Sequence, residues 1–149
     1  MIKNLYVYSR QVIEAIQPHD VPHVVVSITT PGDPALANIK TNEHTLKILR
    51  LSFHDLDDAA MQHVEIKDQY EAQCFSPTHA RQILALVKTY TEAQRLIVHC
   101  DAGWSRSPAV AAALSKILTG DDSHYFKRYS PNMRVYCTIL NEHYTEHAS

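Results

Sequence analysis

The chain has 149 residues, which is the size of one domain and is long enough to bury a core without disulfides or metal ions. Hydrophobic residues make up 45% and charged residues 20% of the chain, and this balance favours an ordinary globular protein over a disordered one. The formal net charge of -2 gives no reason to expect nucleic acid or an anionic membrane as a partner, so any affinity for anions must be local.

Neither the N-terminus nor the cysteines indicate export. The first residues contain no apolar core of signal-peptide length, and no window approaches about 18 consecutive apolar residues, so we expect a cytoplasmic protein. Cys74, Cys100 and Cys137 are an odd number without CxxC spacing, which argues against a disulfide framework and against a zinc site. We expect one of the three to have a chemical role and the other two to lie in the core.

Hydrophobic periodicity and turn residues predict alternating strands and helices over a single domain, 1–149. The chain begins with a strand at 4–9 and a helix at 10–17, which Pro18 ends. A nearly continuous apolar run at 23–30 is typical of a strand buried on both faces of a parallel sheet. The remaining predicted elements are a strand at 46–53, a loop with a short helix at 61–73, a helix from 77 to about 90, a strand at 96–98, and helices at 109–118, 121–129 and 135–144.

This order of elements predicts an α/β fold. We expect a small, mainly parallel sheet of about four to five strands flanked by helices, with a helical C-terminal third. The ten histidines are scattered and form no HExxH pair, so we expect no metal site and no cofactor.

The segment 96–109, LIVHCDAGWSRSPA, carries the chemistry. It reads as a strand, a loop with one glycine and the start of an alanine-rich helix. In such a turn, backbone N–H groups from Asp101 to Arg106 can converge on one point, where the helix dipole adds positive potential. That point suits a phosphate dianion and stabilises a Cys100 thiolate, while the Arg106 guanidinium can hold two phosphate oxygens. The hydroxyl of Ser107 can donate a hydrogen bond to the sulfur.

The sequence HCDAGWSRSPA resembles the phosphate-binding loop of the protein tyrosine phosphatase superfamily, His-Cys-x5-Arg-Ser/Thr, and its GxSRSP ending resembles the compact dual-specificity branch. The resemblance implies the cysteine-phosphatase fold, with Cys100 as nucleophile and Ser107 assisting breakdown of the phosphocysteine. It also implies that His99 organises the loop. The implied phosphate-binding residues are Asp101, Ala102, Gly103, Trp104, Ser105 and Arg106.

A departing phenolate should leave protonated, so the reaction also needs a general acid. The superfamily places an aspartate on a loop upstream of the cysteine, and LRLSFHDLDD resembles that segment. Asp55 aligns best. Asp57 and Asp58 stay as alternatives because the spacing to Cys100 is somewhat longer than is usual in the family.

Two loop residues carry specific expectations. An acidic Asp101 directly after the nucleophile should oppose highly anionic ligands such as polyphosphoinositides, provided that it points toward the pocket mouth. Trp104 has two interpretations, an aromatic wall for a substrate ring or a packing residue on the rim.

The sequence therefore predicts a cysteine-dependent protein phosphatase for phosphotyrosine, with phosphoserine and phosphothreonine as further candidates. Its expected partner is a phosphorylated protein or peptide, with no nucleic acid and no membrane, and we expect a monomer. A small-molecule phosphate monoesterase and a phosphate-binding pseudophosphatase are the alternatives. A rhodanese-like sulfur carrier fits the loop ending and the upstream aspartates poorly.

Overall fold

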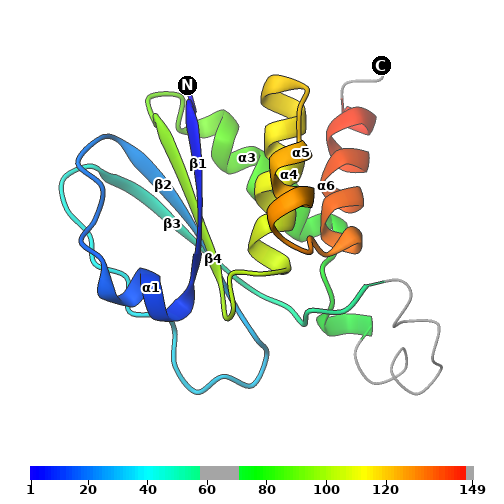
Figure 1. Ribbon diagram of the computed structural model, residues 1–149, viewed down its shortest axis with the longest axis horizontal. Coiled ribbons are helices and arrows are strands. Elements are labelled where there is room, and N and C mark those ends of the chain that lie inside the picture. Colours follow the sequence, from blue (N-terminus) through cyan, green and yellow to red (C-terminus); the bar gives the residue numbers. More distant parts are fainter. Residues whose placement is uncertain (58–70, 147–149) are drawn as a thin grey trace.

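A computed structural model describes residues 1–57 and 71–146. Four strands form one parallel sheet in the order β1-β4-β2-β3, where β1 is Asn4–Ser9, β2 is His23–Thr29, β3 is Thr45–Ser52 and β4 is Arg95–Cys100. The helix α1, Arg10–Ala15, lies on one face, and the α-helices that follow it lie on the other (Figure 1). They are α3, Pro77–Thr89, α4, Arg106–Thr119, α5, Ser123–Arg128, and α6, Met133–Glu146. The predicted small parallel α/β fold is confirmed.

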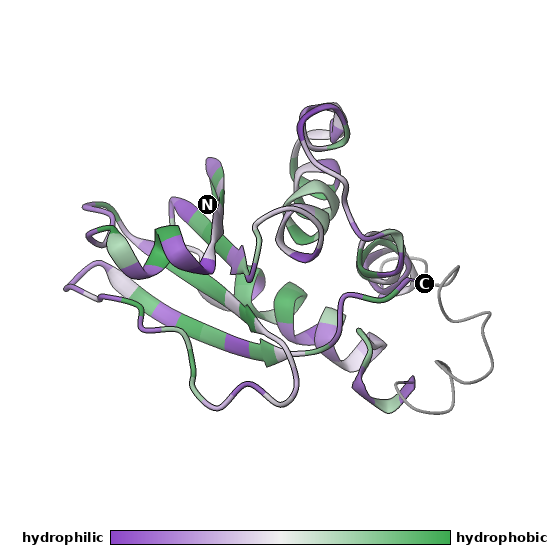
Figure 2. Cartoon of the chain, turned by 60° about the horizontal axis from the view of Figure 1, so that its bottom comes forward, coloured by the Kyte–Doolittle hydropathy of each residue, from purple (hydrophilic) through white to green (hydrophobic). Residues whose placement is uncertain are grey.

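Burial follows the sequence pattern. All seven residues of β2 are buried, as the uninterrupted apolar run predicts for an inner strand of a parallel sheet. The hydrophobic residues concentrate on the strands and on the facing side of the helices (Figure 2). The larger core cluster joins the sheet to α3, α4 and α6, and a smaller one around Ile13, Val25 and Ile97 lies under α1.

The helix α4 is the central element of the helical layer. Nine consecutive residues from Arg106 to Leu114 are buried, because the helix contacts β1 and β4 on one side and α5 and α6 on the other. Its alanines permit this close packing on two sides. The first turn of α4 is therefore held between the sheet and the neighbouring helices.

Several element boundaries differ from the sequence prediction by one to three residues. The first helix ends at Ala15 rather than at 17, and its C-cap residue Ile16 already has extended backbone. The helix predicted at 109–118 begins earlier, at Arg106. Only η2, Glu71–Gln73, of the segment predicted as loop and short helix at 61–73 lies within the described residues.

The cysteine interpretation is half right. Cys74 is buried as expected, whereas Cys137 on α6 is exposed, so its placement in the core was wrong.

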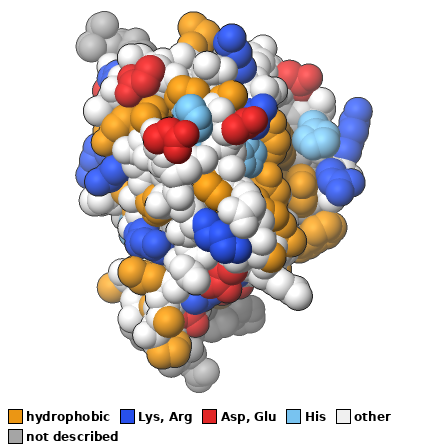
Figure 3. All heavy atoms as spheres, turned by 90° about the vertical axis from the view of Figure 1, so that its left-hand side faces the viewer, with side chains coloured by type: hydrophobic (Ala, Val, Ile, Leu, Met, Phe, Trp, Pro, Cys, Tyr) orange, Lys and Arg blue, Asp and Glu red, His pale blue; other side chains and the backbone are white. Residues whose placement is uncertain are grey.

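The space-filling view of the α1 side shows acidic and basic side chains interspersed with hydrophobic ones (Figure 3). In residues 1–57 and 71–146, no helix has the length and apolar character needed to cross a membrane.

Candidate active site

The carboxyl ends of the four strands meet at one edge of the sheet. In the parallel register, Ser9 of β1 pairs with Cys100 of β4, and Ser27 of β2 pairs with His99. Since all strands run the same way, the residues that follow them gather at this edge. The candidate site is built there.

Cys100 is the last residue of β4, and its side chain is buried. The backbone N–H of Ser107 donates to Cys100 Sγ at 3.4 Å, and Ser107 Oγ lies 3.1 Å from the same sulfur. Both groups belong to the first turn of α4, a 14-residue helix whose dipole is positive at this end. A backbone N–H, a hydroxyl and the positive end of the helix dipole thus all face the Cys100 sulfur.

Two neighbouring segments, the start of α1 and the connection between α5 and α6, hold the loop between β4 and α4 from outside. Arg10 N–H donates to the carbonyl of Asp101 at 3.1 Å, Ser130 N–H to that of Trp104 at 3.1 Å, and Asn132 N–H to that of Ser105 at 3.0 Å. In a trans peptide the C=O and N–H point in opposite directions. The N–H groups that follow these carbonyls therefore point toward the inside of the loop, which is the orientation an oxyanion needs.

The loop also packs tightly against the end of β1. Gly103 has φ +68°, and a Cβ at this position would lie 2.7 Å from Ser9 N and 2.9 Å from Tyr8 C. Glycine is required here for both reasons, because a side chain would be strained and would collide with backbone.

Arg106 is buried at the start of α4, and its guanidinium is held in place by described residues. Nη1 donates to Thr30 Oγ1 at 3.0 Å and to the carbonyl of Phe53 at 2.9 Å, while Nη2 donates to Asp101 Oδ2 at 3.0 Å. The Asp101 side chain, 41% exposed, thus faces the arginine rather than open solvent alone.

Asp55 lies on the loop after β3 and reaches the phosphate loop. Its Oδ1 accepts hydrogen bonds from Ser105 Oγ and from Asn132 Nδ2, each at 2.8 Å. Ser105 is the N-cap of α4 but makes no capping bond with its side chain, because the hydroxyl is turned to Asp55. Of the two alternatives, Asp57 lies within the described residues and Asp58 lies outside them.

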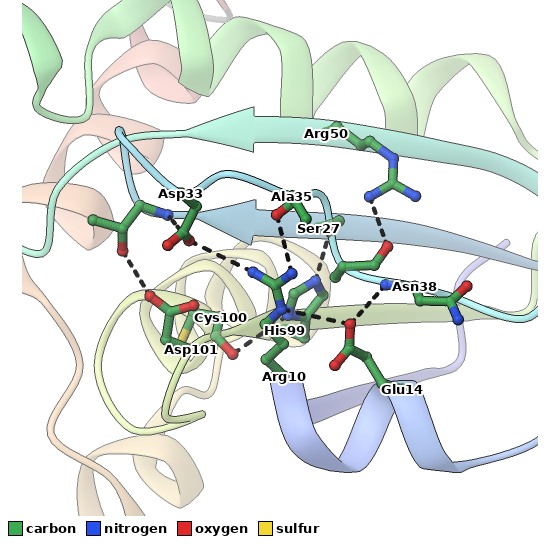
Figure 4. A network of polar contacts seen from close by, with 12 residues as sticks. Arg10, Glu14, Ser27, Asp33, Ala35, Asn38, Arg50, His99, Cys100 and Asp101 are labelled. Atoms are coloured by element: carbon green, nitrogen blue, oxygen red, sulfur yellow. Dashed lines mark hydrogen bonds and ion pairs between the residues drawn. The ribbon is translucent and has the colours of Figure 1, made fainter.

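His99 lies beneath the loop and is fully buried. Its Nε2 is 2.6 Å from Ser27 Oγ, and its Nδ1 is 3.3 Å from the carbonyl of Cys100 (Figure 4). Burial lowers the pKa of His99, and the hydrogen bond to the Cys100 backbone opposes this effect only in part. The ring is therefore neutral, with Nδ1–H donating to the Cys100 carbonyl and Nε2 accepting from Ser27.

An ionic network fixes the segment beside Asp101. Arg10 donates to the carbonyl of Ala35 at 3.0 Å and lies 3.5 Å from carboxylate oxygens of both Glu14 and Asp33 (Figure 4). Asp33 in turn accepts from Thr30 N–H at 3.2 Å. The network positions Thr30, the residue that contacts both Asp101 and Arg106.

Trp104 lies on the rim and is 55% exposed. Its ring meets Tyr129 edge to face, with centroids 6.2 Å apart. Tyr129 also stacks on Tyr125, with centroids 6.4 Å apart. The rim thus carries an aromatic surface next to the phosphate loop.

Sequence reasoning missed Ser27, Thr30 and Asn132. Thr30 follows a buried strand, as the aspartates do, so the rule that strand ends converge could have indicated it. Ser27 occupies a position inside an apolar run, where a lone polar residue calls for a buried partner. Asn132 lies between two helices, and nothing in the local pattern relates it to Asp55.

Groups of three or more His, Cys, Asp or Glu side chains with metal-binding geometry are absent from 1–57 and 71–146.

No protein-family model matches the chain, and no curated protein matches it at the sequence level. Solved structures do match. Human DUSP28 is 18% identical with a TM-score of 0.53, covering 97% of this chain and 94% of its own. Tk-PTP in its active form is 14% identical with a TM-score of 0.54, covering 92% of this chain and 90% of its own.

PTPMT1 in complex with PI(5)P also matches, with 15% identity and a TM-score of 0.53, over 87% of this chain and 82% of its own. These neighbours belong to the protein tyrosine phosphatase superfamily. At these identities the likeness shows the fold. The chain has the fold of these structures, which is the fold that the loop sequence predicts.

Proposed function

We propose that this chain is a cysteine-dependent phosphatase that hydrolyses phosphate monoesters through a phosphocysteine intermediate. One observation carries the proposal: the sulfur of Cys100 lies against the backbone N–H and the hydroxyl of Ser107, at the positive end of α4. A buried strand-end cysteine with a purely structural role has no need of a backbone N–H and a hydroxyl on its sulfur at the start of a helix.

In the first step the Cys100 thiolate attacks phosphorus, the S–P bond forms and the P–O bond to the leaving group breaks. Asp55 gives its proton to the departing oxygen. Both hydrogen bonds from Ser105 and Asn132 go to Oδ1, so Oδ2 is the oxygen from which we expect the proton to leave. Arg106 and the loop amides supply the positive charge that the transferring phosphoryl group needs.

In the second step water attacks the phosphocysteine, Asp55 takes a proton from it, and the S–P bond breaks to release inorganic phosphate. The leaving group is now the Cys100 thiolate, which Ser107 stabilises through the same two contacts. The enzyme returns to its starting state without an external reductant or oxidant.

Phosphotyrosine in a protein or peptide is the first candidate substrate, with phosphoserine and phosphothreonine next. Trp104 and Tyr129 offer aromatic surface beside the loop, which favours an aryl ester. The neighbour PTPMT1 was solved with PI(5)P. In this chain the phosphate loop contains no lysine to bind a second phosphate group, so a phosphoinositide is the less favoured alternative.

The test is hydrolysis of p-nitrophenyl phosphate with EDTA present, from about pH 4 to about pH 8, for the wild type beside Cys100→Ser. We expect turnover by the wild type and none by the variant. Persisting turnover in Cys100→Ser would contradict the mechanism. An inert wild type that still binds tungstate would favour the phosphate-binding alternative.

Substrate class is tested separately. Initial rates with a phosphotyrosine peptide, its phosphoserine counterpart and an inositol monophosphate should rank in that order. A reversed order, with the inositol ester fastest, would favour the small-molecule phosphatase.

A further inference from the structure

The buried guanidinium of Arg106 leaves one edge without a protein partner. Its side chain is only 7% exposed, and Nη1 already donates hydrogen bonds to Thr30 Oγ1 and to the Phe53 carbonyl. Within the described part of the chain, Arg106 Nε is the one buried side-chain nitrogen or oxygen that has no hydrogen-bond acceptor. A buried donor without an acceptor costs free energy unless a ligand satisfies it.

Asp101 lies at the end of the guanidinium formed by Nη1 and Nη2, away from Nε. Its Oδ2 accepts from Arg106 Nη2 at 3.0 Å and from Thr30 Oγ1 at 2.6 Å, and Thr30 Oγ1 accepts from Nη1 at 3.0 Å. These four atoms close a ring of contacts around the Nη1–Nη2 end. The Nε–H and the second hydrogen of Nη2 lie on the other edge, and two parallel N–H groups of this kind match two phosphate oxygens.

We propose that Asp101 is a positioning residue: its carboxylate, with Thr30, holds the end of the Arg106 guanidinium so that the Nε–Nη2 edge is presented to the phosphate. This inference rests on the proposed function, since it assigns a role within the same site. It gives the acidic residue after the nucleophile a favourable effect on oxyanion binding, where charge alone predicts an unfavourable one.

The contacts around Asp101 support a fixed role. The backbone carbonyl of Asp101 accepts a hydrogen bond from Arg10 N–H, and the backbone N–H of its partner Thr30 donates to Asp33. Both residues that contact the Arg106 guanidinium are therefore fixed through their backbones. Burial opposes ionisation of Asp101, but hydrogen bonds from Thr30 and Arg106 outweigh it and hold the pKa below the ordinary value of 3.8. The carboxylate is charged throughout the assay range.

If Asp101 competed with phosphate for Arg106, its carboxylate would occupy the Nε–Nη2 edge of the guanidinium. Asp101 contacts Nη2 and leaves the buried, unpartnered Nε available to donate to a ligand. Positioning and competition therefore predict opposite effects of removing the carboxylate.

The experiment compares Asp101→Ala, Asp101→Asn and Thr30→Val in p-nitrophenyl phosphate turnover, in inhibition by vanadate and in calorimetric binding of tungstate. Vanadate mimics the trigonal-bipyramidal transition state, where a bidentate arginine is most effective. We expect Asp101→Ala to lower kcat/KM and vanadate affinity by about tenfold, with a smaller change in KM. Asp101→Asn keeps an oxygen acceptor and should recover part of the loss, and Thr30→Val should lose about threefold.

The matched control is Asp20→Asn, which removes the same charge from an exposed position before β2, at the other end of the sheet. It should leave all three measurements at the wild-type level. Thermal unfolding of each variant separates misfolding from mispositioning, and the Asn and Val variants carry the test if Asp101→Ala does not fold.

Vanadate and tungstate affinities that stay equal or rise in the folded Asp101 variants would overturn the inference, because a competitor or a bystander predicts that result. If the wild type binds tungstate without hydrolysing the substrate, the proposed function fails while the binding comparison still decides the role of Asp101. A wild type that binds neither oxyanion contradicts both.

Discussion

The carboxylate of Asp55 accepts a hydrogen bond from the side-chain amide of Asn132 at 2.8 Å, across 77 residues of sequence. A second bond, from Ser105 Oγ, fixes the same oxygen to the phosphate loop. Asn132 is itself anchored by its backbone N–H to the Ser105 carbonyl at 3.0 Å. The loop that precedes the site, the phosphate loop and the start of α6 are thus joined at one carboxylate.

This placement predicts a leaving-group effect for Asp55→Asn. Removing a general acid should cost about 10²–10⁴-fold in kcat with phenyl phosphate or a phosphotyrosine peptide, whose leaving oxygen is strongly basic. The loss should be much smaller with p-nitrophenyl phosphate, because p-nitrophenolate leaves readily without a proton. Asp57→Asn is the matched control and should behave as the wild type. Equal losses with both esters would remove Asp55 from the role of acid.

Asn132→Ala should act through Asp55. Without the Asn132 amide, the Asp55 carboxylate keeps only the hydrogen bond from Ser105 Oγ. We therefore expect kcat to fall by about three- to tenfold while KM changes little. The double variant Asp55→Asn/Asn132→Ala should be no slower than Asp55→Asn alone, because the acid whose position Asn132 holds is already gone. Additive losses in a double-mutant cycle would indicate an independent role for Asn132.

Ser107→Ala should change the rate-limiting step. The variant keeps the backbone N–H on Cys100 but loses the hydroxyl, so expulsion of the thiolate in the second step is slowed by about tenfold or more. Stopped-flow assays with p-nitrophenyl phosphate should then show a burst of p-nitrophenolate near one equivalent, and mass spectrometry should show a phosphorylated enzyme. Slow turnover without a burst would place the hydroxyl in the first step instead.

Gly103→Ala should cost more stability than the same change at Gly120. Both glycines have positive φ, +68° and +80°, so each substitution meets the left-handed penalty of about 1 kcal/mol. Only at Gly103 would the new methyl also overlap the β1 backbone, 2.7 Å from Ser9 N, and we expect a total loss of about 3 kcal/mol. Urea unfolding measures both losses, and equal values would show that the loop yields to the methyl group.

The stability of the protein should decrease as the pH falls through the histidine range. Burial holds the pKa of His99 below its ordinary value of 6.5, so below about pH 6.5 the unfolded chain binds a proton that the folded chain does not. The free energy of unfolding contributed by the neutral ring is thus present above that pH and is lost toward acid. In His99→Asn the dependence of Tm on pH between about 7 and 5 should be shallower than in the wild type. An unchanged slope would contradict the neutral assignment of His99.

Much of the site could be predicted from sequence because it is local. Cys100, Arg106 and Ser107 are joined by one short turn between a strand and a helix, and the backbone geometry of that turn decides their proximity. The parallel sheet was predictable for a similar reason, since the uninterrupted apolar run of β2 suits only a strand covered on both faces.

The rest was decided by tertiary structure. No local pattern brings Asn132 to Asp55 or Thr30 to Arg106, because both contacts depend on how α6 and β2 pack around the edge of the sheet. The sign of the Asp101 effect is of the same kind. In sequence it is a negative charge beside a candidate phosphate site, but its carboxylate is paired with Arg106 and Thr30. This pairing is why we propose an effect opposite to that of an isolated charge. Residue types and spacing determined which chemistry we propose, and packing determined which edge of the Arg106 guanidinium is occupied by Asp101 and Thr30.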